Sequence, residues 1–331
     1  MVFSSIFSKK ISVLFIVFGS FIIGYKGKSF INKKIYEPIR SLVVRPQVQP
    51  TISNYKSVEC PINGISIATF GQSNSANTVA YHYQEQIPRN LFMYDWRSQQ
   101  CYKYQEPLPG TNGTGGNVIT YTGVKIASIS DDPVIIIPFG VGQTSVLQWA
   151  YGDLSYQHKI AMERISKSRL SPTVFLWHQG EQDRNLELWT SDDLTNVEPF
   201  GRLDSYWVMG ISEDGYYNAL KLIVERTLES FPDAKFGIAL ASRCRGKEWE
   251  PVRKAQLKIT KTTLKTFLSA DSDQIYGNQY RSDSCHFSPE GARKLGSLYY
   301  ESILKNSTKL GTNKVLDTIP APNAINKARP S

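Results

Sequence analysis

Three short segments that lie far apart in the chain carry side chains able to cleave an ester together. The first, residues 70–74, places Ser73 after a glycine, and a serine hydroxyl becomes a nucleophile once a neighbouring base can take its proton. Another, residues 283–286, holds Asp283 and His286 three positions apart, so the carboxylate can orient one imidazole nitrogen while the other faces Ser73. We therefore expect Ser73 as nucleophile, His286 as base and then acid, and Asp283 as the residue that orients His286.

Stabilisation of the negative charge that develops on the ester oxygen is a further requirement, because losing one hydrogen-bond donor commonly costs on the order of 100-fold to 1,000-fold in rate. Three donors are candidates: the backbone amide of Ser73, the amide of either Gly115 or Gly116, and the side chain of Gln179. Gln179 lies in the remaining segment, residues 177–183, which reads Trp-His-Gln-Gly-Glu-Gln-Asp.

Polar neighbours of these residues are expected to support the site. Gln72, Asn74 and Glu181 are assigned hydrogen-bonding roles around the Ser73 turn and Gln179. Glu181 could also be read as a metal ligand together with His178 and Asp183, but the spacing matches no metal-site pattern. Phosphate-loop and dinucleotide fingerprints are absent as well, so we expect neither a metal nor a cofactor.

Each candidate also has an ordinary structural interpretation. Ser73 could be a helix N-cap, Asp283 a turn residue and His286 an exposed loop histidine. His178 is the rival to His286 as the base, since the chain has only four histidines.

The order and spacing of the segments resemble a known family. The sequences Gly-Gln-Ser-Asn around Ser73, residues 177–183 and residues 283–286 are similar to those of the SGNH hydrolase superfamily, in its sialate O-acetylesterase-like and acetylxylan esterase-like branch. A stretch at 134–149 looks like the family's strand and following loop, with Gln143 in place of its second glycine. The resemblance covers roughly residues 61–305.

The resemblance implies a carbohydrate O-acetylesterase that works through an acyl-enzyme on Ser73, with an acetylated carbohydrate as substrate. In such relatives a glycine block and the glutamine of Gln-Gly-Glu supply oxyanion donors. Two alternatives remain open: a sugar O-acyltransferase that uses the same serine, and a non-catalytic glycan-binding protein on an esterase fold.

The elements that must position these residues alternate between strand and helix. Short apolar runs bounded by turn residues predict strands at 65–70, 134–139, 173–177 and 235–240. Helical patterns follow at 216–231, at 252–268 and after Ser288, which is a natural N-cap ahead of Pro289. The alternation predicts a three-layer α/β/α sandwich with a mostly parallel central sheet, and ligands bind at the carboxyl ends of such strands.

Two regions, 78–120 and 184–212, lack clear periodicity and are predicted to be long loops over the site. The Ser73 segment follows the strand at 65–70 directly, so its hydroxyl is expected where a strand ends and a helix begins.

Charge is concentrated at the ends of the chain. The net charge is +9, but residues 1–47 carry eight Lys/Arg against one Glu, and residues 306–331 carry four against one Asp. The central part is therefore close to neutral, and no nucleic-acid partner is expected.

The N-terminus predicts a membrane-targeting segment. Lys9 and Lys10 precede an apolar run at 11–25, which suits a signal-peptide core or a short signal anchor. We expect an anchor or signal peptide at 1–30, a stalk at 31–60, the esterase domain at 61–305 and a flexible tail at 306–331. The domain is expected outside the cytoplasm, anchored to the membrane, or secreted if the segment is cleaved.

The four cysteines show no CxxC spacing, which argues against a zinc cluster. Three full disulfide pairings exist, and we favour Cys60 with Cys101 and Cys244 with Cys285, the latter bracing the loop that carries His286. Buried free thiols are the alternative.

Overall fold

The structure, a computed structural model, describes residues 48–183, 197–203 and 206–307, without the side chains of 197–209. The predicted membrane segment at 1–30, most of the stalk and nearly all of the tail lie outside these residues. Within the described part of the chain, no helix is long and apolar enough to cross a membrane.

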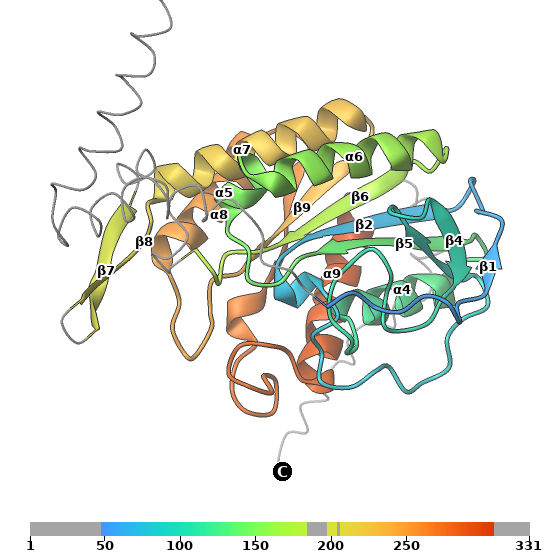
Figure 1. Cartoon of the computed structure of the whole chain (residues 1–331), viewed down its shortest axis with the longest axis horizontal. Helices are drawn as coiled ribbons and strands as arrows, with labels where there is room; N and C mark the ends of the chain where they lie inside the picture. The colour runs from blue at the N-terminus through green and yellow to red at the C-terminus, as the bar shows by residue number, and fades with distance from the viewer. Residues whose placement is uncertain (1–47, 184–196, 204–205, 308–331) are drawn as a thin grey trace, which may run out of the picture.

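A large, mostly parallel sheet forms the centre of the molecule (Figure 1). Within the described residues it has eight strands in the spatial order β1-β4-β3-β5-β2-β6-β9-β10. The six strands from β3 to β10 run parallel, whereas β4 and β1 add antiparallel pairs at one edge. Their bounds are β1 Ser57–Val58, β2 Ile65–Gly71, β3 Leu91–Asp95, β4 Gln100–Lys103, β5 Val134–Gly140, β6 Pro172–His178, β9 Lys235–Leu240 and β10 Thr266–Asp271.

The strand order reverses at β2. After β2 the chain builds β3 to β5 on one side, and it then crosses to β6, β9 and β10 on the other. In open α/β sheets, ligands bind outside the carboxyl ends of the strands at such a reversal. The end of β2 is therefore the position where this topology favours a site.

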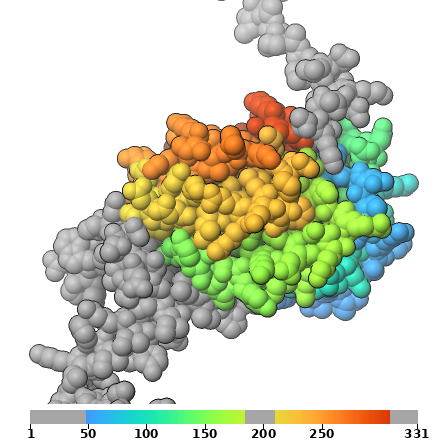
Figure 2. Space-filling model, turned by 90° about the horizontal axis from the view of Figure 1, so that it is seen from above, coloured from blue at the N-terminus to red at the C-terminus, as the bar shows by residue number. Residues whose placement is uncertain are grey.

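Helices cover both faces of the sheet. Helices α4 (Val118–Ile129) and α9 (Pro289–Asn306) lie on one face, and α5 (Val146–Ala150), α6 (Asp153–Lys167), α7 (Glu213–Ser230) and α8 (Glu250–Thr262) lie on the other (Figure 1). Figure 2 shows α6, α7 and α8 side by side on the second face. The predicted three-layer α/β/α architecture is confirmed.

The side chains of β2 point alternately into two separate hydrophobic cores. Ile65 and Ile67 pack with α4 and α9, whereas Ala68 and Phe70 pack with α5 to α8, as the side-chain period of two requires. Every residue of β2 is buried, which matches its near-continuous apolar sequence.

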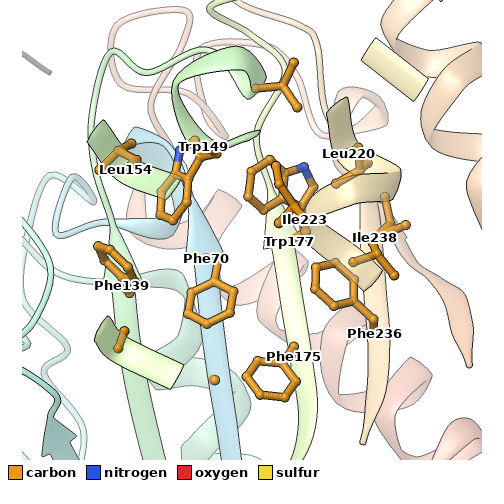
Figure 3. Close-up of a cluster of buried hydrophobic side chains, with 14 of the residues drawn as sticks. Phe70, Phe139, Trp149, Leu154, Phe175, Trp177, Leu220, Ile223, Phe236 and Ile238 are labelled. Carbon is orange, nitrogen blue, oxygen red and sulfur yellow. The ribbon is translucent and has the colours of Figure 1, made fainter. Parts of the chain in front are cut away.

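Aromatic rings fill the larger core (Figure 3). Phe70 and Phe175 stack with their ring centroids 5.5 Å apart, and Phe236 continues the row 6.4 Å beyond Phe175. Trp149 and Trp177 are buried at 5.5 Å from each other in an edge-to-face arrangement. Both tryptophans therefore serve as packing.

Two sequence expectations need correction. The helix predicted at 252–268 is α8 followed by β10, because the chain reverses at Lys265, which has a φ of +63°. The loop predicted at 78–120 contains β3, β4 and the start of α4, where short strands carry too little periodicity to be recognised.

The loop predicted at 184–212 contains an antiparallel hairpin, β7 (Val197–Leu203) with β8 (Tyr206–Ile211). Residues 184–196 of that region lie outside the described part.

Both favoured disulfides are present, Cys60–Cys101 and Cys244–Cys285. The predicted N-cap is also correct, since the Ser288 side chain accepts a hydrogen bond from Gly291 N at the start of α9.

Candidate active site

Ser73 follows the end of β2 in a single 3-10 turn, Ser73–Ser75, and not in a long helix. Gly71 has a φ of +133°, and a Cβ atom there would lie 2.0 Å from the carbonyl oxygen of His178. Only glycine allows β2 and β6 to end this close together. The next residue is fixed to the same strand, because Gln72 N donates to His178 O at 3.1 Å. Ser73 is consequently held at the carboxyl edge of the sheet, 7% exposed.

Asp283 and His286 form a directly bonded pair on the loop before α9. His286 Nδ1 lies 2.6 Å from Asp283 Oδ2, and Asp283 Oδ1 accepts from the backbone amides of His286 at 2.7 Å and Cys285 at 3.0 Å. Partial burial acts to raise the pKa of Asp283, but the hydrogen bonds from His286 outweigh it and lower that pKa below its ordinary value. Asp283 is therefore a carboxylate that holds one nitrogen of a half-buried imidazole.

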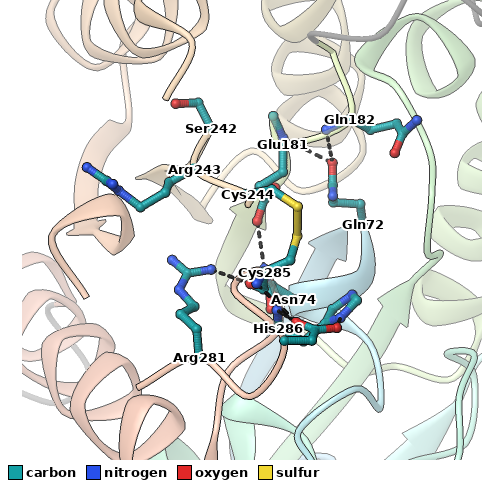
Figure 4. Close-up of a disulfide and its surroundings, with 12 residues drawn as sticks. Gln72, Asn74, Glu181, Gln182, Ser242, Arg243, Cys244, Arg281, Cys285 and His286 are labelled. Atoms are coloured by element: carbon teal, nitrogen blue, oxygen red, sulfur yellow. Dashed lines mark hydrogen bonds and ion pairs between the residues drawn. A yellow bond between two sulfur atoms is a disulfide. The ribbon is translucent and has the colours of Figure 1, made fainter. Parts of the chain in front are cut away.

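Figure 4 shows His286 beside Asn74, the residue that follows Ser73 in the turn. Asn74 Nδ2 donates to the carbonyl oxygen of Cys285 at 3.3 Å, so the residues adjacent to Ser73 and His286 are in contact. Among the described residues no hydrogen bond joins Ser73 Oγ to His286. Catalytic hydrogen bonds are commonly long before substrate binds.

Asn74 contacts a buried carboxylate that also lies beside His178. Asn74 Nδ2 also donates to Glu181 Oε1 at 2.7 Å, and His178 Nε2 lies 3.3 Å from the same oxygen. Burial acts to raise the pKa of Glu181, but hydrogen bonds from His178 and Asn74 lower it to about 2. His178 is buried and bonded through Nδ1 to Tyr299, which separates this rival base from the surface.

Gln72 ties the Ser73 turn to residues 179–182. Its Oε1 accepts from Gln179 Nε2 at 3.2 Å, Gly180 N at 3.3 Å and Gln182 N at 3.1 Å. These three bonds cross between segments more than 100 positions apart in sequence, so the side chain fixes the two segments against each other.

The side chain of Gln179 forms its hydrogen bonds inside the core. Its side-chain amide bonds Gln72, the carbonyl oxygen of Thr144 at 2.9 Å and the carboxylate of Asp183, while Tyr216 donates to its Oε1 at 3.0 Å. The residue has no exposed surface. Its amide hydrogens are therefore not available to an oxyanion in this arrangement, contrary to the role expected from the sequence.

The glycines at 115 and 116 do not supply free amides either. Gly115 N donates to Asn77 O at 3.0 Å, and Gly116 N donates to Val79 O at 2.9 Å. A Cβ at Gly115 would lie 2.3 Å from the same Val79 carbonyl oxygen, so this glycine allows two backbone segments to pack closely. These two backbone amides are therefore not available as oxyanion donors, contrary to the expectation from the sequence.

The loop after β5 contains another candidate for an oxyanion donor. Gly140 pairs with Gly71 in the sheet, and Val141 N donates to Gly71 O at 2.9 Å, which places the loop beside the Ser73 turn. Gln143 adopts a φ of +59°, the left-handed conformation that glycine prefers. The backbone amides of Ser73 and Gln143 donate to no acceptor within the described residues. The sequence marks the same position, since Gln143 stands where the family that the motifs resemble has its second glycine.

Among the side chains that the structure describes, no group of three or more could hold a metal ion.

The chain was compared with known protein families, sequences and structures. No family model matches the chain, and no curated protein matches it in sequence. The structure is similar to a protein of Arabidopsis thaliana, with a TM-score of 0.55 and 16% identity over 74% of this chain and 99% of that one. It also matches a carbohydrate acetylesterase from Xanthomonas citri, with a TM-score of 0.47 and 12% identity over 74% of this chain and 56% of that one.

A second carbohydrate acetylesterase, from Sinorhizobium meliloti, matches with a TM-score of 0.44 and 11% identity over 73% of this chain and 99% of that one. The match to the Arabidopsis protein, at a TM-score of 0.55, agrees with the α/β/α fold described above. At these identities the likeness concerns the fold alone.

Proposed function

We propose that this protein is a serine esterase that removes acetyl groups from a carbohydrate. The observation that carries the proposal is the Asp283–His286 pair, bonded at 2.6 Å and joined through Cys285 and Asn74 to the turn that bears Ser73. A carboxylate, an imidazole and a serine at the carboxyl edge of a parallel sheet are the parts that nucleophilic acyl transfer requires.

In the first step Ser73 Oγ attacks the ester carbonyl carbon while His286 Nε2 takes its proton. The tetrahedral intermediate collapses, the C–O bond to the sugar breaks, and His286 returns the proton to the sugar oxygen. Water then attacks the acetyl-Ser73 ester with His286 again as base, which releases acetate and restores Ser73. Asp283 holds Nδ1–H and stabilises the imidazolium that forms in both steps.

The oxyanion donors are assigned to the backbone amides of Ser73 and Gln143. Both lack an acceptor within the described residues, and both belong to segments that end adjacent, paired strands. Backbone donors of this kind cost no reorganisation when negative charge develops. The positive φ of Gln143 supports the assignment, because strained backbone is found preferentially at functional sites.

The choice of an acetylated carbohydrate rests on the motif resemblance. A location outside the cytoplasm is proposed for a separate reason: disulfides persist in oxidising compartments, and Cys60–Cys101 and Cys244–Cys285 are both formed. Anchoring through residues 1–30 is part of the same proposal.

Acetate release from 4-nitrophenyl acetate, acetylated xylan and O-acetylated sialic acid tests the proposal, with the Ser73→Ala variant as control. We expect release that depends on Ser73, and the preferred ester identifies the carbohydrate class. Release that requires an added sugar acceptor would instead indicate an acyltransferase. Absence of serine-dependent release from folded protein would reject the esterase and favour a glycan-binding role.

A further inference from the structure

Arg281 is a buried cation that the proposed chemistry does not use. It is 3% exposed, and burial lowers the pKa of its guanidinium. Among the described residues it forms no ion pair with a carboxylate. Its nitrogens donate instead to three carbonyl oxygens, those of Ile275 and Ser272 at 2.8 Å each and that of Cys285 at 2.5 Å. The guanidinium also lies 3.9 Å from the centroid of the Phe287 ring.

The carboxylates of Glu181 and Asp273 offset part of the cost of burying this charge, although neither forms an ion pair with it. The hydrogen bonds of Arg281 all go to carbonyl oxygens. Two of these acceptors belong to the segment after β10, and the third belongs to the residue that precedes His286.

The Cys285–His286 peptide unit is held at both ends. Its carbonyl oxygen accepts from Arg281 Nη1 and from Asn74 Nδ2, and its N–H, which belongs to His286, donates to Asp283 Oδ1 at 2.7 Å. Figure 4 shows these contacts gathered around Cys285, whose sulfur is bonded to Cys244. A planar peptide fixed at its oxygen and its hydrogen cannot rotate, so the imidazole starts from a fixed backbone position.

Charge is arranged along the same contacts. Glu181 bonds Asn74, Asn74 bonds the Cys285 carbonyl, and Arg281 bonds that carbonyl beside it. A carboxylate at one end and a guanidinium at the other polarise the hydrogen bonds between them, which strengthens each one in a buried setting.

We propose that Arg281 is a positioning residue for His286, acting through the carbonyl oxygen of Cys285 that it shares with Asn74. The proposal rests on the proposed esterase function. Loss of the guanidinium removes the shorter of the two hydrogen bonds to this carbonyl oxygen and allows the peptide to shift. A displacement of about 1 Å in a catalytic group can cost on the order of 100-fold in rate. Binding of the ester should change little, because Arg281 does not reach the surface.

The test measures kcat and KM for 4-nitrophenyl acetate in Arg281→Met and Arg281→Lys, with kcat expressed per serine that reacts in an active-site titration. Arg293→Met is the matched control, because this α9 arginine is half-exposed and pairs with Glu85 away from the His286 loop. We expect kcat per site to fall roughly 10-fold to 100-fold in Arg281→Met, with KM within about twofold of the wild type. The lysine ammonium is a single nitrogen and cannot span the three carbonyls that Arg281 reaches from three separate nitrogens, so Arg281→Lys should recover only part of the rate.

Rescue of kcat by added guanidinium is a measurement that would not change if Arg281 only stabilised the fold. Millimolar guanidinium chloride should raise the kcat of Arg281→Ala several-fold and leave Arg293→Met unchanged. If Arg281→Met does not fold, Arg281→Lys and the rescue decide the question. Wild-type kcat per titrated serine in every folded Arg281 variant would overturn the positioning role while leaving the esterase intact. An inactive wild type would instead reject the proposed function itself.

Discussion

Ser73 lies at the end of a buried central strand, whereas His286 lies on a partly exposed loop, and the two regions are held in place differently. The Ser73 turn is bonded by the backbone of Gln72 to the end of β6 and by the side chain of Gln72 to residues 179–182. The His286 loop has few backbone partners in the sheet. It is held by one disulfide and by side chains that converge on Cys285.

The difference shows that the nucleophile and the acid–base residue are held in position by different kinds of contact. The nucleophile at the edge of the sheet is held rigidly, because moving it would break buried hydrogen bonds. An acid–base residue on a loop stays open to substrate and solvent, but its position depends on a few specific contacts. Removing a contact of the Ser73 turn should therefore lower stability, and removing a contact of the His286 loop should lower the rate as well.

Replacing His286 by Ala should have the largest effect. We expect kcat/KM for 4-nitrophenyl acetate to fall by at least about 10⁴-fold, because the serine loses its base. The melting temperature should change little, since the imidazole is about one-third exposed. Steady-state kinetics and a thermal melt check both statements, and retention of more than roughly 1% of the wild-type rate would contradict them.

The two disulfides offer a matched comparison, because each joins cysteines 41 positions apart. Removing either one by paired Cys→Ala changes should lower the free energy of unfolding by a similar amount, about 4 kcal/mol in the chain-entropy model. Only the loss of Cys244–Cys285 should also lower kcat, by about 10-fold, because only this bond touches the His286 loop. Denaturant titration and kinetics of both double variants provide the check, and equal loss of kcat in the two would remove the distinction.

Gln72→Ala tests the opposite region. Two buried donors and one partly buried donor lose their acceptor, so the free energy of unfolding should fall by about 2–4 kcal/mol. Gln84→Ala is the control, since Gln84 is exposed and bonds a neighbouring carbonyl. Urea unfolding compares the two variants, and a cost at Gln72 no larger than at Gln84 would show that the bonds do not secure the turn.

Asp183 should make stability depend on pH. Burial raises its pKa from 3.8 to about 7, so the folded state binds the proton more tightly than the unfolded state does. Its contribution to the free energy of unfolding therefore falls as pH rises from about 4 to 7, where the buried charge appears. Asp183→Asn should remove this decline and gain about 1–3 kcal/mol at pH 8. Unfolding at several pH values measures it, and an unchanged slope between pH 4 and 7 would exclude Asp183 as the cause.

Sequence patterns located the strands that carry the site but not every residue that serves it. The strands at 65–70 and 134–139 were readable because fully buried parallel strands are continuous apolar runs. Ser288 and Pro289 marked the last helix for an equally local reason, the demands of a helix N-terminus. The disulfide pairing chosen from three was also correct.

Availability of a hydrogen-bond donor could not be predicted in the same way. Gly115, Gly116 and Gln179 carry suitable groups, but whether those groups are free depends on contacts with Asn77, Val79 and Asp183 that only the fold creates. The buried contacts of Arg281 with three carbonyls were missed for the same reason, since nothing in its sequence position distinguishes it from a surface arginine.

Trapping the acyl-enzyme tests the central claim most directly. Full-length protein mixed with 4-nitrophenyl acetate, quenched in acid during the first turnover and digested, should carry an acetyl group on the peptide that contains Ser73. The label should be absent from Ser73→Ala and greatly reduced in His286→Ala. Acetate release without a label on Ser73, or a label on another residue, would contradict the account.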